Sequence, residues 1–176
     1  VDGSSQVFAA GPPVVERSLG QKITKEELGG PPLAVDLAGT IDNRVPNEEA
    51  CFAQIKRFLS YMPGNVWELP PVVEVNDPID RCDEELVSIV PKDRRRPYNM
   101  RKLIGHVVDS GSFFEIQPTF GKALITGLAR MNGKVVGIIA NNPMIYGGAM
   151  DVKAARKQIH FVEMCDCFHI PLIFFV

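Results

Sequence analysis

Residues 123–140 read ALITGLARMNGKVVGIIA, and this stretch decides the fold. Two apolar runs rich in β-branched residues, 123–130 and 134–140, flank the pair Asn132-Gly133. An Asn-Gly pair between two such runs favours a tight hairpin, because both residues accept the positive φ that the turn needs. The sequence therefore predicts two antiparallel strands joined at Asn132-Gly133.

The segment that follows the hairpin predicts a helix over 151–168 and then a strand over 171–176. We expect the following apolar residues to form the side of the helix that faces the core: Val152, Ala155, Ile159, Val162 and Phe168. The basic residues expected to lie off that side are Lys153, Arg156 and Lys157. Residues 171–176, PLIFFV, have the composition of a strand buried on both faces. This strand would close a β-α-β unit, whose crossover we expect to be right-handed.

Shorter elements are predicted before the hairpin. Residues 5–15 predict a short strand and then a turn. Thr24 and Glu27 have the spacing of a capping box. Gly29-Gly30 is expected to end that helix at once, and Pro31-Pro32 to forbid its continuation.

Asn47 is placed to cap the clearest helix of the first half, which Pro63-Gly64 is expected to stop. Residues 68–81 are interrupted by three prolines and follow no helical or strand period, which predicts an extended connector. A second helix is expected from Asn99, with a strand over 113–116. The apolar residues of the first helix recur at steps of three and four: Cys51, Phe52, Ile55, Phe58, Leu59 and Met62.

Composition restricts the class of protein. The chain has 176 residues, 45% hydrophobic and 23% charged, with a net charge of -2. These values are typical of a globular domain and argue against a nucleic-acid partner, which usually meets a basic stripe. The one basic run, 94–96, is interpreted as a solvated loop rather than an anion site. There is no signal peptide and no apolar run long enough to span a membrane, so we expect a cytoplasmic protein, or one of the mitochondrial matrix in a eukaryote.

Cysteine spacing gives no framework for a metal or a disulfide. The four cysteines form no CxxC pair, and the three histidines complete no zinc spacing. We expect no metal, and buried or half-buried free thiols in a reducing compartment. His106, His160 and His169 are interpreted as structural. The cysteines are Cys51, Cys82, Cys165 and Cys167.

The linker 141–151, NNPMIYGGAMD, is the best candidate for a site. Gly147 and Gly148 would let a substrate approach the backbone closely. Their amides lie beside a helix N-terminus, where negative charge is favoured, so they could hold an oxyanion. Equally, the glycines could simply make a tight turn before Asp151 caps the helix. Spacing alone leaves both readings open.

Several motifs occur along the chain in the order of one known family. Residues 23–30, ITKEELGG, resemble the T-x-E-x-L-G-G signature of the biotin-dependent carboxyltransferases. Residues 98–101, YNMR, are similar to its Y-D-M-R. Residues 109–115, DSGSFFE, resemble D-x-G-S-F-x-E. Further stretches of the resemblance are 7–15, 126–130, 136–143 and 165–172.

The resemblance implies an α/β, crotonase-like (ClpP/crotonase) ββα superhelix. Residues 1–67 would end the first lobe, 68–97 would connect the lobes, and 98–176 would begin the second. In this family acyl-CoA binds mainly to the first lobe, while biotin on a carrier protein enters from the second. The implied activity is transfer of a carboxyl group between carboxybiotin and an acyl-CoA. Backbone oxyanion holes stabilise the substrate enolate and the ureido oxygen of biotin.

The implied partners are a biotin carboxyl carrier protein, a biotin carboxylase and further copies of the chain, because the active site forms between subunits. By correspondence with crotonase-like folds, the oxyanion donors fall at Gly147, Gly148 and Ala149. The candidate substrate-binding residues are Asn142, Pro143, Tyr146, Gly29 and Gly30.

The sequence departs from the family at two places. Residues 35–36 stand where a histidine is common, and Asn99 replaces the usual Asp. Because the terminal run 171–176 would form an exposed apolar edge, we expect the chain to be a section of something longer, inactive by itself. Two alternatives stay open: a biotin-independent crotonase-like hydratase, isomerase or decarboxylase, or a non-catalytic subunit-interface module.

Overall fold

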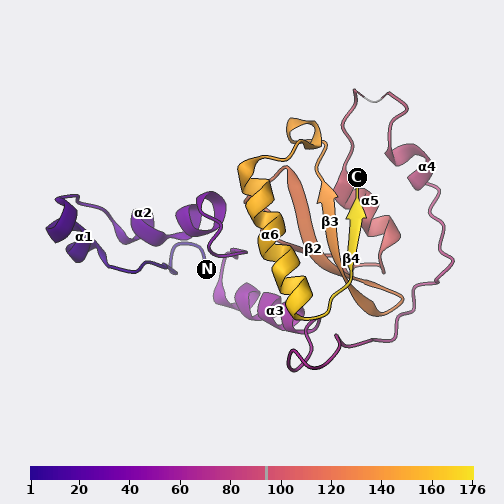
Figure 1. The fold of residues 1–176 in the computed structure, drawn as a ribbon, viewed down its shortest axis with the longest axis horizontal. Coiled ribbons are helices and arrows are strands. Elements are labelled where there is room, and N and C mark those ends of the chain that lie inside the picture. The colour runs from indigo at the N-terminus through magenta and orange to yellow at the C-terminus, as the bar shows by residue number, and fades with distance from the viewer. Residues whose placement is uncertain (94) are drawn as a thin grey trace.

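The computed structural model describes residues 1–93 and 95–176, so the first residue of the basic run 94–96 lies outside the described residues. A four-stranded sheet forms the body of the molecule, in the order β1-β2-β3-β4. The first three strands are antiparallel and β4 lies parallel to β3 (Figure 1). The strands are β1 (Phe114–Ile116), β2 (Leu124–Met131), β3 (Lys134–Asn141) and β4 (Leu172–Phe175).

The predicted hairpin is confirmed. Strands β2 and β3 pair from Leu124 to Met131, and Asn132 (φ 50°) and Gly133 (φ 74°) make the turn. The carboxylate of Asp109 accepts hydrogen bonds from both turn amides, each at 2.8 Å. The turn is thereby stabilised by Asp109, a residue outside the hairpin, as well as by its own two residues.

Helices cover both faces of the sheet. Helix α6 (Val152–Cys167) packs on one face, against a cluster that includes Leu124 and Leu128. Helix α5 (Met100–Val107) packs on the other, against Ile125 and Ala129. Alternate residues of β2 therefore enter different cores, which is why the strand is apolar along almost its whole length.

The predicted core side of α6 is confirmed only in part, by Val162 and Phe168, which pack against the core. The buried residues are Ala154, Lys157, Phe161 and Cys165, whereas Val152 and Ile159 are 72% and 58% exposed. Apolar residues occur around the whole helix, so its periodicity does not select one side. The side of α6 that packs on the sheet is the one that carries a small residue (Ala154), an aromatic ring (Phe161) and a thiol (Cys165).

Asn47 caps helix α3 (Glu48–Leu59) as predicted, its side chain accepting the amide of Ala50 at 2.8 Å. The helix ends at Leu59, before Pro63-Gly64. Only part of its apolar side is covered: Phe58 packs against the core under α6, whereas Phe52 is exposed.

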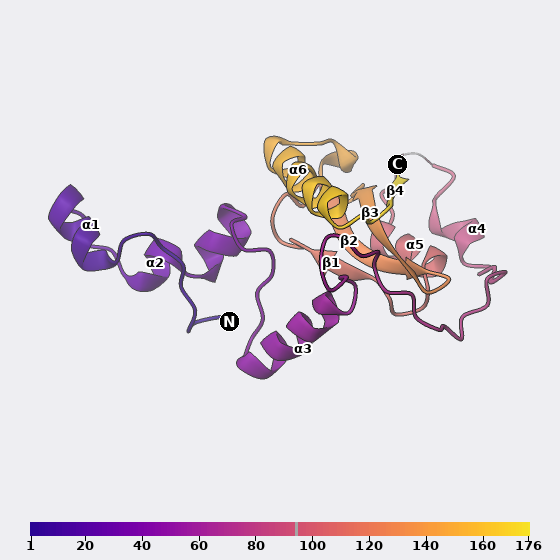
Figure 2. The same cartoon turned by 60° about the horizontal axis from the view of Figure 1, so that its bottom comes forward.

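The first 45 residues form an arm that projects from the sheet (Figures 1 and 2). The predicted capping box is present, with the Thr24 hydroxyl accepting the Glu27 amide and the Glu27 carboxylate accepting the Thr24 amide. The strand expected over 5–15 is wrong. Its two prolines instead occupy the first turn of a helix, where no amide partner is needed. The arm contains α1 (Pro12–Leu19), α2 (Lys25–Gly29) and the π-helix η1 (Pro32–Leu37).

Two further expectations concern the segments around the arm and the sheet. The expected end of the Thr24-capped helix is confirmed, because α2 ends at Gly29, and Pro32 then begins the separate η1. Residues 68–81 contain neither helix nor strand, as predicted, and the short α4 (Leu86–Ile89) follows. Asn99 caps α5, as predicted. None of the helices in residues 1–93 and 95–176 combines the length and apolar character needed to cross a bilayer.

Candidate functional site

The loop between β3 and α6 is anchored by Asn142. Its backbone amide donates to Ala123 O and its side-chain amide donates to Lys122 O, both at 2.8 Å. Its Oδ1 accepts the amide of Met144 at 3.3 Å. Asn142 is 4% exposed, so this predicted substrate-binding residue holds the loop in place through its own polar atoms.

The three predicted oxyanion donors differ in how their amides are used. The amide of Gly148 donates to Ile145 O at 2.8 Å, and that of Ala149 donates to Tyr146 O at 3.2 Å. Within residues 1–93 and 95–176, the amide of Gly147 meets no acceptor. The glycine doublet therefore makes a turn and also presents one exposed free donor. The tight turn is therefore confirmed, and the oxyanion role stays a prediction.

Both glycines adopt positive φ, 64° at Gly147 and 84° at Gly148. A Cβ at Gly147 would meet no atom within 4 Å, whereas one at Gly148 would lie 2.8 Å from the side-chain nitrogen of Asn141. Gly148 is thus required by both conformation and space. Gly147 is required by conformation alone.

A cleft of about 590 Å³ lies next to this loop. It brings Asp36 and Arg44 of the arm together with Tyr146 of the loop. Tyr146, a predicted substrate-binding residue, is 77% exposed there, whereas Pro143 does not line the cleft. The remaining lining residues are Thr119, Gly121, Lys122, Ala123, Met144, Ile145, Asp151 and Lys153.

Gly29 and Gly30 are packed inside the arm and do not line this cleft. The carbonyl of Gly29 accepts the amide of Val7 at 2.9 Å, and a Cβ at Gly29 would lie 2.2 Å from Val7 O. A Cβ at Gly30 would meet Glu26. The close approach that these glycines allow is between segments of the arm itself. The structure does not bring them to the 141–149 loop.

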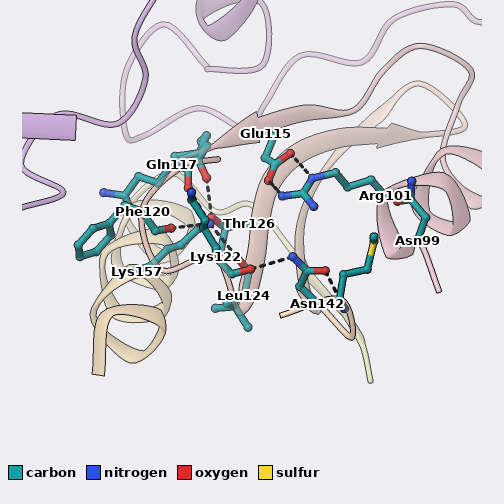
Figure 3. Close-up of polar contacts among 12 residues, drawn as sticks. Asn99, Arg101, Glu115, Gln117, Phe120, Lys122, Leu124, Thr126, Asn142 and Lys157 are labelled. Carbon is teal, nitrogen blue, oxygen red and sulfur yellow. Dashed lines mark hydrogen bonds and ion pairs between the residues drawn. The ribbon is translucent and has the colours of Figure 1, made fainter. Parts of the chain in front are cut away.

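Lys157 is the polar residue whose position the sequence did not reveal. It is 1% exposed, and its Nζ donates to the carbonyls of Gln117, Leu124 and Phe120 at 2.7, 2.8 and 3.2 Å (Figure 3). Burial lowers the pKa of Lys157 to about 8, against the opposing influence of the Glu115 carboxylate. The only signal in the sequence was its helical spacing from Ala154, Phe161 and Cys165.

The Glu115 carboxylate makes a paired contact with Arg101, whose Nε and Nη2 each donate to it at 2.7 Å. This fork joins α5 to β1. A bidentate geometry of this kind fixes direction as well as distance. Figure 3 shows the Arg101–Glu115 pair and the Lys157 contacts along the same part of the sheet.

The chain matches the family model described as the carboxyl transferase domain over residues 1–176. It belongs to the carboxyl transferase domain family. It is 39% identical over 176 residues to the mitochondrial propionyl-CoA carboxylase beta chain of Homo sapiens, covering 100% of this chain and 33% of that protein. It is 38% identical over 176 residues to the methylmalonyl-CoA decarboxylase subunit alpha of Veillonella parvula, covering 100% of this chain and 35% of that protein.

Among solved structures, transcarboxylase 12S, described as a hexamer assembly with hydrolysed methylmalonyl-coenzyme A bound, superposes with a TM-score of 0.91. The identity is 34%, covering 97% of this chain and 34% of that one. The resemblance read from the sequence is therefore confirmed, and with it the α/β crotonase-like fold. The chain spans about a third of the length of the relatives it matches.

The histidines of this carboxyl transferase domain make structural contacts. His106 is half-buried and bonds Asp83 at 2.7 Å and Glu85 at 3.0 Å, which ties the connector to α5. The hydrogen bond to His106 lowers the pKa of Asp83. His160 is exposed and bonds Asp42 at 3.1 Å. His169 bonds Val66 O at 3.0 Å.

The cysteines follow the expectation only in part. Cys165 is buried, and burial raises the pKa of its thiol to about 12. Cys51 is half-buried, but Cys82 and Cys167 are exposed, contrary to expectation. Across the part of the chain that the structure describes, no three His, Cys, Asp or Glu side chains are grouped to hold a metal ion.

Proposed function

We propose that the protein containing this chain is a biotin-dependent acyl-CoA carboxyltransferase, which moves a carboxyl group between carboxybiotin and an acyl-CoA. The observation that carries the proposal is the match to the carboxyl transferase domain over all 176 residues. The relatives named above, a propionyl-CoA carboxylase beta chain and a methylmalonyl-CoA decarboxylase subunit, are both named for carboxyl chemistry on an acyl-CoA.

The geometry supports a role for Gly147 in this chemistry. Its N–H is exposed and free, and it adjoins Tyr146, which lines the cleft. A backbone donor aimed at an oxygen that gains negative charge stabilises that charge without reorganising, and loss of one such donor costs about 100- to 1000-fold in rate. Bound carboxybiotin would supply the activated carboxyl group.

The cleft is also suited to an anionic ligand. Arg44, Lys122 and Lys153 line it with Asp36 and Asp151, and Arg44 is paired with Asp36 at 3.1 Å. Lys122 and Lys153 are absent from the ion pairs formed by the described residues. Their charge would favour a carboxylate or phosphate in the cleft.

The remaining parts of the proposal concern organisation. Residues 1–67, 68–97 and 98–176 would be the end of a first lobe, a connector and the start of a second lobe. The partners would be a biotin carboxyl carrier protein, a biotin carboxylase and further copies of this protein. The protein would work in the cytoplasm, or in the mitochondrial matrix of a eukaryote.

The test compares Gly147→Val with Gly111→Val in the full-length protein. Both glycines have positive φ, 64° and 70°, and at both a Cβ would meet no atom within 4 Å, so the two variants carry matched backbone strain. A β-branched residue does not hold this φ, so the peptide at residue 147, which adjoins the cleft-lining Tyr146, should rotate and redirect its N–H. We expect Gly147→Val to lower kcat for biotin-dependent carboxylation of propionyl-CoA at least tenfold, with Gly111→Val near the wild type.

Other outcomes would redirect the proposal. Equal losses in both variants would return the 147–148 turn to a structural role. The 38% identity to the Veillonella decarboxylase subunit favours release of a carboxyl group from methylmalonyl-CoA as a second candidate. Turnover that never depends on biotin would favour a biotin-independent crotonase-like enzyme. Absence of turnover with every acyl-CoA tested would favour a non-catalytic interface module.

A further inference from the structure

We propose that Lys157, on the buried side of α6, is a positioning residue for the 141–149 loop. It would act through the 117–124 turn and would set the direction of the Gly147 amide. The inference rests on the proposed function for the effect on turnover, but its structural part can be tested separately. Lys157 lies outside the cleft and would not touch substrate.

The first step is the contact between Lys157 and the turn. Its three acceptors, the carbonyls of Gln117, Phe120 and Leu124, span the whole segment between β1 and β2. An ammonium group has three donors, so all three are used. This segment also adopts two positive φ values, 55° at Gln117 and 52° at Gly121. One buried cation therefore holds a turn that is otherwise unfavourable for its backbone.

The second step leads from the turn to the loop. Lys122 O and Ala123 O lie inside the span held by Lys157. Lys122 O accepts the side-chain amide of Asn142 at 2.8 Å (Figure 3), and Ala123 O accepts the Asn142 backbone amide at 2.8 Å. Asn142 O then accepts the Ile145 amide at 3.0 Å, and Ile145 O accepts the Gly148 amide at 2.8 Å. The position of the Gly147 peptide is thus connected to Lys157 through a series of hydrogen bonds joined by short stretches of backbone.

Close packing of the 117–124 turn against α6 gives a second connection between this turn and the 141–151 loop. A Cβ at Gly121 would lie 2.9 Å from Lys153 O and 3.0 Å from the Ala154 backbone, so the turn lies directly against the first turn of α6. The same helix begins at Asp151, whose carboxylate accepts the Ala154 amide at 2.7 Å. Movement of the turn would therefore disturb both ends of the 141–151 loop.

The experiment uses the full-length protein and Lys157→Met, which keeps the length of the side chain and removes the ammonium. Arg156→Met is the matched control, because it removes one positive charge from the adjacent, exposed position of α6. Lys157→Gln keeps two donors and serves as partial rescue. The readouts are kcat and KM for biotin-dependent carboxylation of propionyl-CoA, and hydrogen–deuterium exchange of peptides from 141–149 and from β2.

We expect Lys157→Met to lower kcat about tenfold or more, since small misplacements of a catalytic group have effects of this size, with KM within about twofold. Peptides from 141–149 should exchange faster while those from β2 stay protected. Lys157→Gln should fall between Lys157→Met and the wild type, and Arg156→Met should match the wild type.

Unchanged hydrogen–deuterium exchange of 141–149 in Lys157→Met would overturn the inference. Equal loss of protection in 141–149 and in β2 would also overturn it, because Lys157 would then support the fold generally. Failure of both Lys157 variants to fold would overturn it for the same reason. A wild-type protein without turnover would refute the proposed function alone, since the exchange comparison would still decide the role of Lys157.

Discussion

The buried ammonium of Lys157 should make the stability of the protein depend on pH in an unusual direction. Its pKa is about 8 in the folded chain, because burial disfavours the charge, and 10.5 is its ordinary value. Below pH 8 both folded and unfolded chains hold the proton. Between about pH 8 and 10.5 the unfolded chain holds more protons than the folded chain. The free energy of unfolding contributed by Lys157 therefore rises with pH across this window.

The size of the effect follows from the two pKa values. A fall from 10.5 to about 8 corresponds to about 3 kcal/mol over the whole window, and to about 1 kcal/mol between pH 7 and pH 9. The Cys165 thiol, with a pKa raised to about 12, acts in the opposite direction. A raised thiol pKa means that the unfolded chain loses its proton first, so stability falls as pH rises above the ordinary value. The wild type and the Lys157→Met variant both contain Cys165, so its contribution cancels in the difference between their free energies of unfolding.

The measurement is urea unfolding followed by circular dichroism, at pH 7 and pH 9, for the wild type, Lys157→Met and Arg156→Met. The free energy of unfolding of the wild type minus that of Lys157→Met should increase by about 1 kcal/mol from pH 7 to pH 9. Arg156→Met should follow the wild type. A difference between wild type and Lys157→Met that stays constant with pH would refute the lowered pKa and the argument from burial.

Three further predictions test the packing around the site. Asp151→Ala removes the cap of α6 and should lower the free energy of unfolding by about 1 kcal/mol in urea; an unchanged value would contradict the cap. Gly137→Val places a Cβ 2.8 Å from the Cys165 sulfur and should cost about 1–3 kcal/mol, seen as a lower unfolding midpoint; an unchanged midpoint would show room there. A thiol reagent should modify Cys82 and Cys167 before Cys165, as mass spectrometry of peptides would show; early modification of Cys165 would contradict its burial.

Features decided within a few residues were predictable. The Asn132-Gly133 turn and the caps at Asn47, Asn99 and Asp151 each depend on backbone groups no more than three positions away. The expected structure is present at all four. The order of family motifs also identified the crotonase-like fold, because it draws on the whole chain at once.

Features that depend on distant partners were not predictable in the same way. The buried side of α6 was assigned correctly only in part, because the sheet, rather than the helix, determines which side is covered. Lys157 was placed among the solvated basic residues, since three carbonyl acceptors between 117 and 124 cannot be read from spacing. The prolines at 12–13 were expected to break structure, yet they begin a helix.

The candidate site shows the same division. The sequence by itself predicted a loop over 141–151 followed by a helix with Asp151 as its cap, because an Asp side chain accepts the free amides of a first helical turn. Only the tertiary structure decided that, of the three predicted oxyanion donors, the Gly147 amide has no acceptor among the described residues. That choice depends on how carbonyls from a separate turn hold Asn142, and those carbonyls reach it only after the sheet and α6 have packed together.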